Sequence, residues 1–344
     1  MYTRFITTLL ALAASLDAHP TRLQPRSTSH QIGYISVDVA TLWTNPHKPR
    51  PVDAPALTNP ANPEEWLHDM TLKQFLNLTT QDRTQSQALY GDLVYILDAK
   101  DGWYHIAATG QPTPKNKLGY PGWVPAAQVS LDTGFGALQS SMPFALVDNA
   151  TSVNIYRDAD MSDVFMSVSY DTRLPVIGQT SDAIQVAVPS GGSAYLSTSD
   201  ASVYSSETAI PYPKGQTLVD AAQRFIGLPY LWGGTSGYSV DCAGLTHTIY
   251  HANGILIGRD ASAQADSNYT GHGVQGTSVA RADLQPGDII FYATNLSDPQ
   301  TVYHDAMYAG NGQMIEAYGA GIPVRITAVR FNDDYWGAER FLTG

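Results

Sequence analysis

The chain has 344 residues, of which 43% are hydrophobic and 15% are charged. This composition is typical of folded protein and excludes long disordered segments, and the length predicts two or three domains. The formal net charge of −12 argues against a nucleic-acid partner and against a polybasic membrane contact, because both need clustered Lys and Arg.

The N-terminus predicts a signal peptide over residues 1–18. Arg4 supplies a positive charge, residues 5–14 form an apolar run, and small residues up to Ala18 suit cleavage. The alternative is a hydrophobic first strand or helix. The run is too short to span a bilayer, and no later stretch approaches the roughly 20 apolar residues of a membrane helix. We therefore expect a secreted, extracellular protein without a membrane anchor, with residues 19–33 as a linker or pro-segment.

Short strands with frequent turns dominate residues 34–208. The segment 35–39 alternates apolar and polar residues, as a half-buried strand does, and 93–97 is a short apolar run that ends in a turn. Short strand-like patterns bounded by turn residues recur at 153–156, 174–178 and 184–188. Residues 63–77, between the strands of the first group, predict a helical insertion. Such patterns favour small barrels. Because GWVP at 122–125 resembles the last strand of bacterial SH3-like cell-wall modules, we expect two SH3-like domains, at 34–135 and 136–208.

A third domain is predicted at 209–344, after a polar segment with two prolines. Helices are expected at 217–226 and 242–253, and strands at 289–292, 304–308, 313–317 and 324–326. Helices followed by an antiparallel run indicate an α+β arrangement. The predicted fold class is therefore multidomain, with two small all-β barrels followed by an α+β domain.

Cys242 is the one cysteine of the sequence, which excludes an intrachain disulfide and a cysteine-based zinc site. It stands where the helix at 242–253 should begin, with Asp241 as a possible N-cap. A helix N-terminus and a neighbouring imidazolium can lower a thiol pKa enough to give a nucleophilic thiolate. Ala243 and Gly244 leave room for a substrate carbonyl, and the N–H of Cys242 would donate to an oxyanion. The alternative is a buried, inert thiol.

A nucleophilic cysteine also needs a base. His304 opens a predicted strand, and Glu316 lies on the next strand across a glycine-rich turn. Their even separation predicts that a hairpin brings both side chains to one face, where a carboxylate can orient an imidazole. His272 lies in a glycine-rich loop and is expected to be exposed.

His247 and His251 are four residues apart on the predicted Cys242 helix, which could suggest one face of a metal site. No third cluster of ligands accompanies them. We expect no metal and no cofactor, and interpret the pair as one face of a solvated or partly buried helix.

Four motifs occur in order over residues 230–317: YLWGG at 230–234, DCAGL at 241–245, LQPGDIIF at 284–291, and His304 followed by YAGNGQMIEA at 308–317. Together they resemble the NlpC family of peptidoglycan cysteine peptidases. The resemblance implies a papain-like domain that cleaves peptide stems of bacterial cell wall, commonly at the γ-D-glutamyl–diamino acid bond. By position it implies that Cys242 is the nucleophile, His304 the base and Glu316 the orienting residue. It also implies that Tyr230 lies near the nucleophile, and we place Tyr230 and Asp241 among the substrate-binding residues.

Two positions depart from the family pattern. Ala243 replaces the usual serine, which removes a possible hydrogen bond to substrate, and Glu316 replaces the usual histidine. A carboxylate can still hold the imidazole and stabilise imidazolium. We therefore expect activity with an altered pH profile, and an inactive descendant is the alternative.

The order of the domains resembles one branch of that family, in which SH3-like modules precede the peptidase and the substrates are muropeptides with a free N-terminal L-Ala. The resemblance implies that Asp260 reads the α-ammonium group, since opposite charge in a closed site selects a free amine. It implies that Tyr120 of the first module lines the site. The alternatives are a solvated loop aspartate and ordinary barrel packing.

The predicted function is therefore a secreted cysteine endopeptidase that hydrolyses γ-D-glutamyl–diamino acid bonds in muropeptides through a Cys-His-Glu triad. One alternative is an inactive protein that binds cell wall through its SH3-like modules. Another is a thiol amidase or acyltransferase that acts on a different substrate, because a fold does not fix a substrate.

Overall fold

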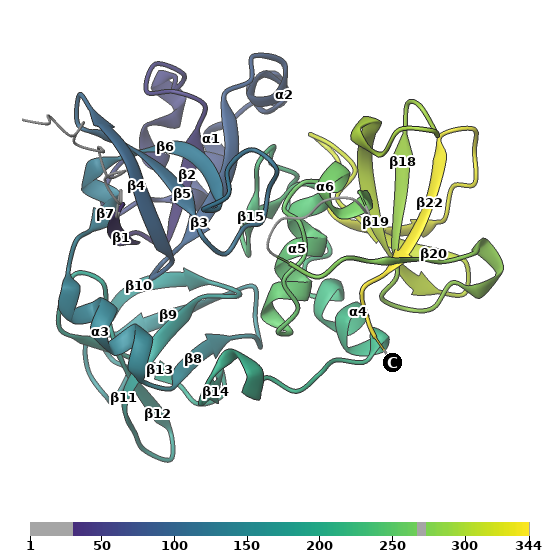
Figure 1. Cartoon of the computed structure of the whole chain (residues 1–344). Helices are drawn as coiled ribbons and strands as arrows, with labels where there is room; N and C mark the ends of the chain where they lie inside the picture. Colours follow the sequence, from purple (N-terminus) through teal and green to yellow (C-terminus); the bar gives the residue numbers. More distant parts are fainter. Residues whose placement is uncertain (1–29, 267–272, 344) are drawn as a thin grey trace, which may run out of the picture.

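The computed structural model describes residues 30–266 and 273–343. The predicted signal peptide and most of the predicted linker lie outside the described residues, as does His272. Among the described residues, no helix is long and apolar enough to cross a membrane. Figure 1 shows three units, with two β-rich units one above the other on the left and a mixed unit on the right.

The first unit is a seven-stranded sheet with the order β3-β2-β6-β5-β4-β1-β7. Its strands are β1 (Gln31–Ile35), β2 (Val39–Trp43), β3 (Thr84–Leu89), β4 (Leu93–Lys100), β5 (Trp103–Ala108), β6 (Tyr120–Pro125) and β7 (Val129–Ser130). Its helices are η1 (Pro51–Ala56), α1 (Pro63–Asp69), α2 (Leu72–Thr80) and η2 (Ala126–Gln128). The helical insertion predicted at 63–77 is confirmed by α1 and α2.

The single strand predicted at 35–39 is wrong. Residues 36–38 form the turn between β1 and β2, although Val37 is fully buried. The alternation of apolar residues was real, but it reflects burial of a loop against the barrel core and not an extended strand. Periodicity alone cannot separate these two cases over five residues.

The second unit is another seven-stranded sheet, with the order β10-β9-β13-β12-β11-β8-β14. Its elements are α3 (Thr133–Ser141), β8 (Phe144–Val147), β9 (Ser152–Tyr156), β10 (Val164–Ser169), β11 (Arg173–Gln179), β12 (Ala183–Ala187), β13 (Ser193–Ser197), β14 (Ala201–Tyr204) and η3 (Glu207–Ala209). In β9, Val153 and Ile155 are buried and Asn154 between them is exposed, as period two requires.

The third unit places helices on one side of a six-stranded sheet with the order β17-β22-β18-β19-β20-β21. Its helices are α4 (Gly215–Gln223), α5 (Cys242–Ala252), α6 (Ala261–Ala265), η4 (Arg281–Asp283) and η5 (Pro299–Thr301). Its strands are β15 (Thr235–Ser236), β16 (Ser239–Val240), β17 (Thr277–Ser278), β18 (Ile289–Ala293), β19 (Val302–Gly310), β20 (Gln313–Glu316), β21 (Arg325–Ala328) and β22 (Tyr335–Arg340). Strand β22, which was not predicted, pairs with β18.

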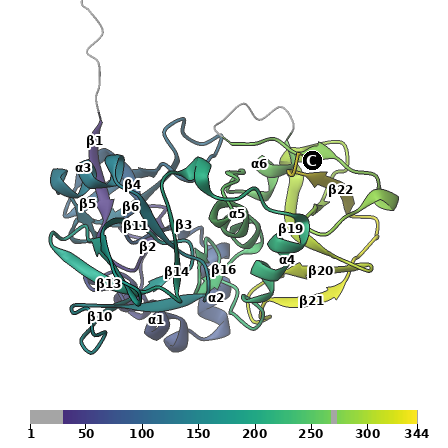
Figure 2. The same cartoon turned by 90° about the horizontal axis from the view of Figure 1, so that it is seen from below.

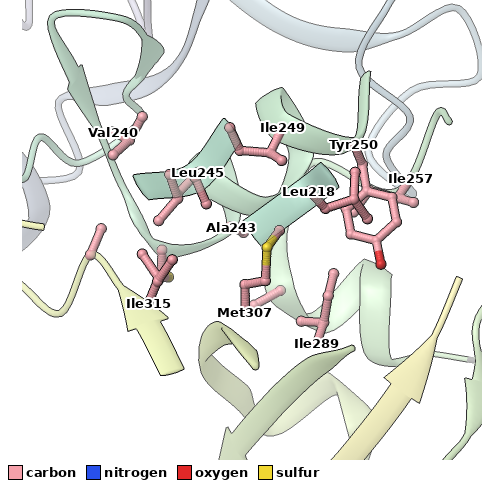
Figure 3. Packing of buried hydrophobic residues seen from close by; sticks show 14 of the residues in the cluster. Leu218, Val240, Ala243, Leu245, Ile249, Tyr250, Ile257, Ile289, Met307 and Ile315 are labelled. Carbon is pink, nitrogen blue, oxygen red and sulfur yellow. The ribbon is translucent and has the colours of Figure 1, made fainter. Parts of the chain in front are cut away.

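The largest buried cluster lies between α5 and this sheet. Figure 3 shows Leu245 and Ala243 of α5 near Met307 of β19 and Ile315 of β20, which belong to one cluster of buried side chains. This packing fixes the start of α5 over the β19–β20 hairpin. The helix ends before Gly254, whose φ of 77° suits glycine.

The predicted order of two all-β units and an α+β unit is confirmed. Helix α5 lies between the first unit and the sheet of the third in the view of Figure 1, and the view from below in Figure 2 keeps that order. The predicted boundary at 135/136 falls within α3, and the one at 33/34 falls within β1. The exact domain limits stay a prediction.

Candidate active site

Cys242 is the first residue of α5, as predicted. Asp241 caps the helix, since its Oδ1 atom accepts a hydrogen bond from the N–H of Gly244 at 2.6 Å. The N–H of Cys242 lies in the first helical turn, where the helix's own carbonyl groups do not reach. Such an N–H can donate to a negatively charged oxygen beside the sulfur.

The Asp241 carboxylate is held by the protein itself. Arg259 donates from Nη1 to Oδ1 at 3.0 Å and from Nη2 to Oδ2 at 2.9 Å, and the N–H of Gly233 donates to Oδ2 at 2.9 Å. Arg259 is buried and also donates from Nε to Oγ of Ser86 in the first unit at 3.0 Å. These bonds give Asp241 a positioning role, and its contact with substrate stays a prediction.

Gly244 allows the helix start to approach the preceding turn. A Cβ atom at this position would lie 1.9 Å from the carbonyl oxygen of Gly234, far inside van der Waals contact. The glycine predicted to leave room for substrate therefore has a packing role as well. Together with the Asp241 cap it fixes the place of the thiol.

The Cys242 thiol is almost fully buried. Burial raises its pKa well above the ordinary value, and the negative charges of Asp305 and Asp241 raise it further. Burial and the two carboxylates thus favour the protonated thiol, so the reaction needs a base that takes the proton. The backbone N–H groups of Asp305 and Ala243 offset part of this rise in pKa, and Asp305 follows His304 on β19.

His304 lies on β19 and is buried. Its Nε2 atom is 2.9 Å from Oε2 of Glu316 on β20, so the predicted hairpin forms and brings these two side chains together. The imidazole stacks on Tyr292, with ring centroids 5.6 Å apart, and Tyr318 meets it edge-on at 5.5 Å. With Nε2 bound to the carboxylate, Nδ1 is the nitrogen left for proton transfer.

Two arginines complete the surroundings of Glu316. Arg330 donates to both carboxylate oxygens, at 3.0 and 2.8 Å, and Arg325 donates twice to Oε1, at 3.1 and 2.9 Å. Burial alone would raise the pKa of Glu316, but the bonds from His304, Arg330 and Arg325 outweigh it and lower the pKa to about 2. Glu316 is therefore a carboxylate near neutral pH, where it can hold the imidazole in one orientation.

Sequence reasoning missed both arginines. Arg325 is paired with Glu316 in the β20–β21 register, and a strand was predicted at 324–326. A predicted pairing of that strand with the strand at 313–317 could have placed Arg325 opposite Glu316. Arg330 follows β21 in an irregular segment, and no local pattern indicates where its side chain goes.

Tyr230 precedes the start of α5 in the chain and is buried. Tyr230 and Cys242 belong to the same buried cluster. Burial raises the pKa of the Tyr230 hydroxyl, and the charge of Cys242 adds to this effect. Tyr230 also lines a cavity of about 270 Å³ between the first and third units. The other lining residues are Met70, Leu72, Phe75, Gly227, Pro229, Gly321, Ile322 and Pro323.

Asp260 and Tyr120 meet across the boundary between the first and third units. The Tyr120 hydroxyl donates toward Oδ1 and Oδ2 of Asp260, at 2.9 and 3.1 Å. Lys115 places its ammonium 3.3 Å from Oδ2, and it also hydrogen-bonds the Tyr120 hydroxyl. The two residues predicted for substrate binding are thus adjacent, and Asp260 can pair with an ammonium group.

The two histidines of α5 stack on each other, and one of them contacts the second unit. His247 and His251 stack at 5.8 Å, and Nδ1 of His251 lies 2.6 Å from Oδ2 of Asp171 in the second unit. Arg173 contacts both Asp171 and His251. Its Nη1 atom lies 2.6 Å from Oδ1 of Asp171, and its Nη2 atom donates to the His251 carbonyl. Within residues 30–266 and 273–343, no group of three or more His, Cys, Asp or Glu side chains could hold a metal ion. His251 thus joins the third unit to the second, whereas Nδ1 of His247 lies 3.0 Å from the Ile257 carbonyl oxygen of its own unit.

Comparisons with known proteins agree with this arrangement. Residues 227–342 match the model of the NlpC/P60 family, and residues 149–204 match that of the YKFC SH3b2 domain. The chain thus has SH3-like units before a papain-like unit, as predicted.

Two relatives match this chain over nearly their whole length. A gamma-D-glutamyl-L-lysine dipeptidyl-peptidase of Bacillus cereus is 37% identical over 99% of this chain and 98% of its own. One of Bacillus subtilis is 29% identical over 84% of this chain and 90% of its own. The crystal structure of an NlpC/P60 family protein from Bacillus cereus superposes with a TM-score of 0.83 at 37% identity, over 91% of this chain and all of that one.

Proposed function

This chain belongs to the NlpC/P60 family, and we propose that it is a cysteine peptidase that cleaves the γ-D-glutamyl bond to an L-diamino acid in peptides derived from peptidoglycan. The observation that carries the proposal is the pairing of His304 with Glu316 beside the helix start that bears Cys242. The names of the two Bacillus relatives supply the bond and favour L-lysine on its leaving side.

The reaction follows from the positions of these groups. Nδ1 of His304 takes the Cys242 proton as the sulfur attacks the γ-glutamyl carbonyl carbon, and the developing oxyanion accepts from the N–H of Cys242. The imidazolium then protonates the leaving amine. Water hydrolyses the thioester and restores the thiol, with Glu316 holding the imidazole throughout.

Asp260 and Tyr120 supply the specificity in this proposal. A free α-ammonium on the residue before D-Glu would pair with the Asp260 carboxylate, which the Tyr120 hydroxyl orients. An ammonium held at a fixed distance from the sulfur limits the cut to the second peptide bond. This geometry supports release of an N-terminal dipeptide, as the relatives' names describe for them.

Mass spectrometry of L-Ala-γ-D-Glu-L-Lys incubated with wild type and with Cys242→Ala tests the proposal. We expect wild type alone to release L-Ala-D-Glu and lysine. The N-acetylated peptide should be cleaved at least about 100-fold more slowly, because it lacks the charge that Asp260 pairs with. Equal cleavage by Cys242→Ala, or none by either protein, would refute the peptidase or its substrate respectively.

We also propose that the protein is secreted through the signal peptide at 1–18, on the strength of its charged start, apolar run and small residues. The substrate class supports this, since cell-wall fragments arise outside the cytoplasm. N-terminal sequencing of the protein from culture medium should find a mature chain that starts near residue 19. Retention of residue 1 on a cell-associated protein would contradict secretion.

A further inference from the structure

The positive charge around Glu316 exceeds what this carboxylate can neutralise. Arg325 and Arg330 both bind Glu316, so two guanidinium groups share one negative charge. In the part of the chain that the structure describes, neither arginine forms an ion pair with another acid. Asp334, a little further along the chain, accepts a hydrogen bond from the Tyr303 hydroxyl at 2.6 Å instead. Glu316 therefore neutralises one guanidinium group, and the second has no anion of its own.

Both guanidinium groups reach the surface and have unused donors. The Glu316 side chain is fully buried, whereas the side chains of Arg325 and Arg330 are 41% and 26% exposed. Arg325 binds Glu316 through Nε and Nη2, and Arg330 binds it through Nη1 and Nη2. Among the described residues, Nη1 of Arg325 and Nε of Arg330 donate to no protein atom. A guanidinium has five N–H groups, so Arg325 can bind a second anion from the solvent side.

These donors lie beside the proposed base. Oε2 of Glu316 lies 2.9 Å from Nε2 of His304 and accepts from Nη2 of Arg330 at 2.8 Å, so one oxygen atom separates the imidazole from a guanidinium. The half-exposed Tyr318 ring meets His304 edge-on, and the Cζ atom of Arg325 lies 5.3 Å from the centre of that ring. Strand β21, which carries Arg325, is the edge strand beside β20 (Figure 2). The positive charge is therefore open to a ligand that lies against His304.

The proposed substrate carries two carboxylates. In L-Ala-γ-D-Glu-L-Lys, the α-carboxylate of D-Glu belongs to the acyl part, whose N-terminus pairs with Asp260 in the proposed function. The α-carboxylate of lysine belongs to the leaving part, and only the α-carbon separates it from the leaving nitrogen. That nitrogen must receive its proton from Nδ1 of His304, so it must lie within hydrogen-bonding reach of the imidazole. The lysine carboxylate is therefore the anion that the reaction brings to His304.

We propose that Arg325, supported by Arg330, forms an anion subsite for the free α-carboxylate of the leaving diamino acid. The planar fork of a guanidinium suits a carboxylate, and Glu316 holds both arginines in place before the substrate arrives. The subsite selects peptides that end at the diamino acid over longer stems, in which the same carboxyl group is part of a neutral peptide bond. This inference rests on the proposed function and deepens it.

The acid and the C-terminal amide of one peptide test the subsite, because the amide lacks that negative charge. For wild type we expect kcat/KM for L-Ala-γ-D-Glu-L-Lys to exceed that for its amide about tenfold or more. In Arg325→Gln this preference should largely disappear, and any effect of the variant on His304 acts on both peptides and cancels in the ratio. Arg157→Gln removes an exposed arginine of the second unit and should keep the wild-type ratio. A wild-type ratio near one, or an unchanged ratio in Arg325→Gln, overturns the proposal.

Binding to Cys242→Ala separates the subsite from the reaction. This variant cannot form the thioester, so calorimetry measures its affinity for both peptides without turnover. The acid should bind about tenfold more tightly than the amide, and Arg325→Gln in the same background should remove the difference. Cleavage of both peptides by wild type with equal binding to Cys242→Ala refutes the subsite and leaves the peptidase supported. Preferential binding of the acid without cleavage by wild type supports the subsite and refutes the peptidase, and the absence of any binding refutes the subsite.

A measurement on wild type covers the case in which Arg325→Gln does not fold, as judged by circular dichroism. The Arg325 side chain is partly exposed, so salt screens its charge. The ratio of kcat/KM for the acid to that for the amide should therefore fall severalfold as the ionic strength rises from about 0.05 M to about 0.5 M. Screening at Asp260 affects both peptides equally and cancels in this ratio. A ratio that stays constant overturns the proposal.

Discussion

The ammonium nitrogen of Lys115 lies 3.3 Å from Oδ2 of Asp260. The carboxylate proposed to bind the α-ammonium of a substrate is thus already paired with an ammonium group of the protein. Lys115 comes from the loop between β5 and β6, and its side chain is 43% exposed, so it can move away. A substrate ammonium must displace Lys115 from Asp260. The free energy of this ion pair is therefore subtracted from the affinity for the substrate.

Removal of this internal competitor should strengthen substrate binding. For Lys115→Met we expect KM for L-Ala-γ-D-Glu-L-Lys to fall about threefold, because a partly exposed ion pair is worth up to about 1 kcal/mol. kcat should stay the same. Steady-state kinetics at low ionic strength measures both. Lys117→Met, in the same exposed loop, is the control, and a KM that rises in Lys115→Met instead would mean that Lys115 helps to bind substrate.

The Glu316 carboxylate predicts how stability depends on pH. Its pKa falls from an ordinary value of 4.5 to about 2 in the folded protein, where His304, Arg330 and Arg325 bind it. A lowered folded-state pKa means that its contribution is fully present above pH 4.5 and is lost as the pH falls toward 2. Glu316→Gln should lower the free energy of unfolding by about 3 kcal/mol near pH 7, since it breaks a buried ion pair.

Urea unfolding of wild type and Glu316→Gln at a series of pH values checks this. The difference between the two proteins should be constant above pH 5, shrink below pH 4.5 and vanish near pH 2. A difference that does not change over this range would show that the charge of Glu316 is not what stabilises the hairpin.

Local pattern was sufficient for the parts of the site that lie within one element or one hairpin. The start of α5 at Cys242 followed from Asp241 and from the apolar periodicity after it. The meeting of His304 and Glu316 followed from an even separation across a tight turn. In both cases the residues are close in sequence, so short-range geometry decides where the side chains go.

Contacts between units could not be predicted in this way. Arg259 binds Ser86, Lys115 binds Asp260, and Arg173 binds His251. Each pair joins residues from different domains, and their meeting depends on how whole domains pack. In the sequence, Arg259, Lys115 and Arg173 are simply charged residues, and such residues are ordinarily expected to lie exposed on the surface.

The pairing of Asp241 with Arg259 predicts a loss of stability when either side chain is removed. Asp241→Ala removes the helix cap and leaves Arg259 buried without a partner, which should lower the free energy of unfolding by about 3 kcal/mol or more. Arg259→Met keeps the cap and should cost less. Urea unfolding compares the two. Because Arg259 also contacts Ser86, Ser86→Ala is the control and should change stability by at most about 1 kcal/mol.

Glu316 stands where the family usually has histidine, and its role beside His304 should depend on Arg325 and Arg330. Restoring the usual residue of the family as Glu316→His leaves Arg325 and Arg330 facing each other without the carboxylate that now neutralises them. An imidazole there would meet two positive charges and could not accept from both. We expect kcat/KM for the tripeptide to fall about 100-fold, because His304 loses its orienting partner.

The triple variant Glu316→His, Arg325→Gln, Arg330→Gln tests the coupling. Removing both positive charges lets the new imidazole turn toward His304, and kcat/KM should recover at least about tenfold over the single variant. Arg281→Gln, which removes a guanidinium stacked on Phe331 in the same unit, is the control and should rescue nothing when combined with Glu316→His. If the single variant keeps wild-type activity, the arginines are not tuned to a carboxylate, and either residue type serves equally well beside His304.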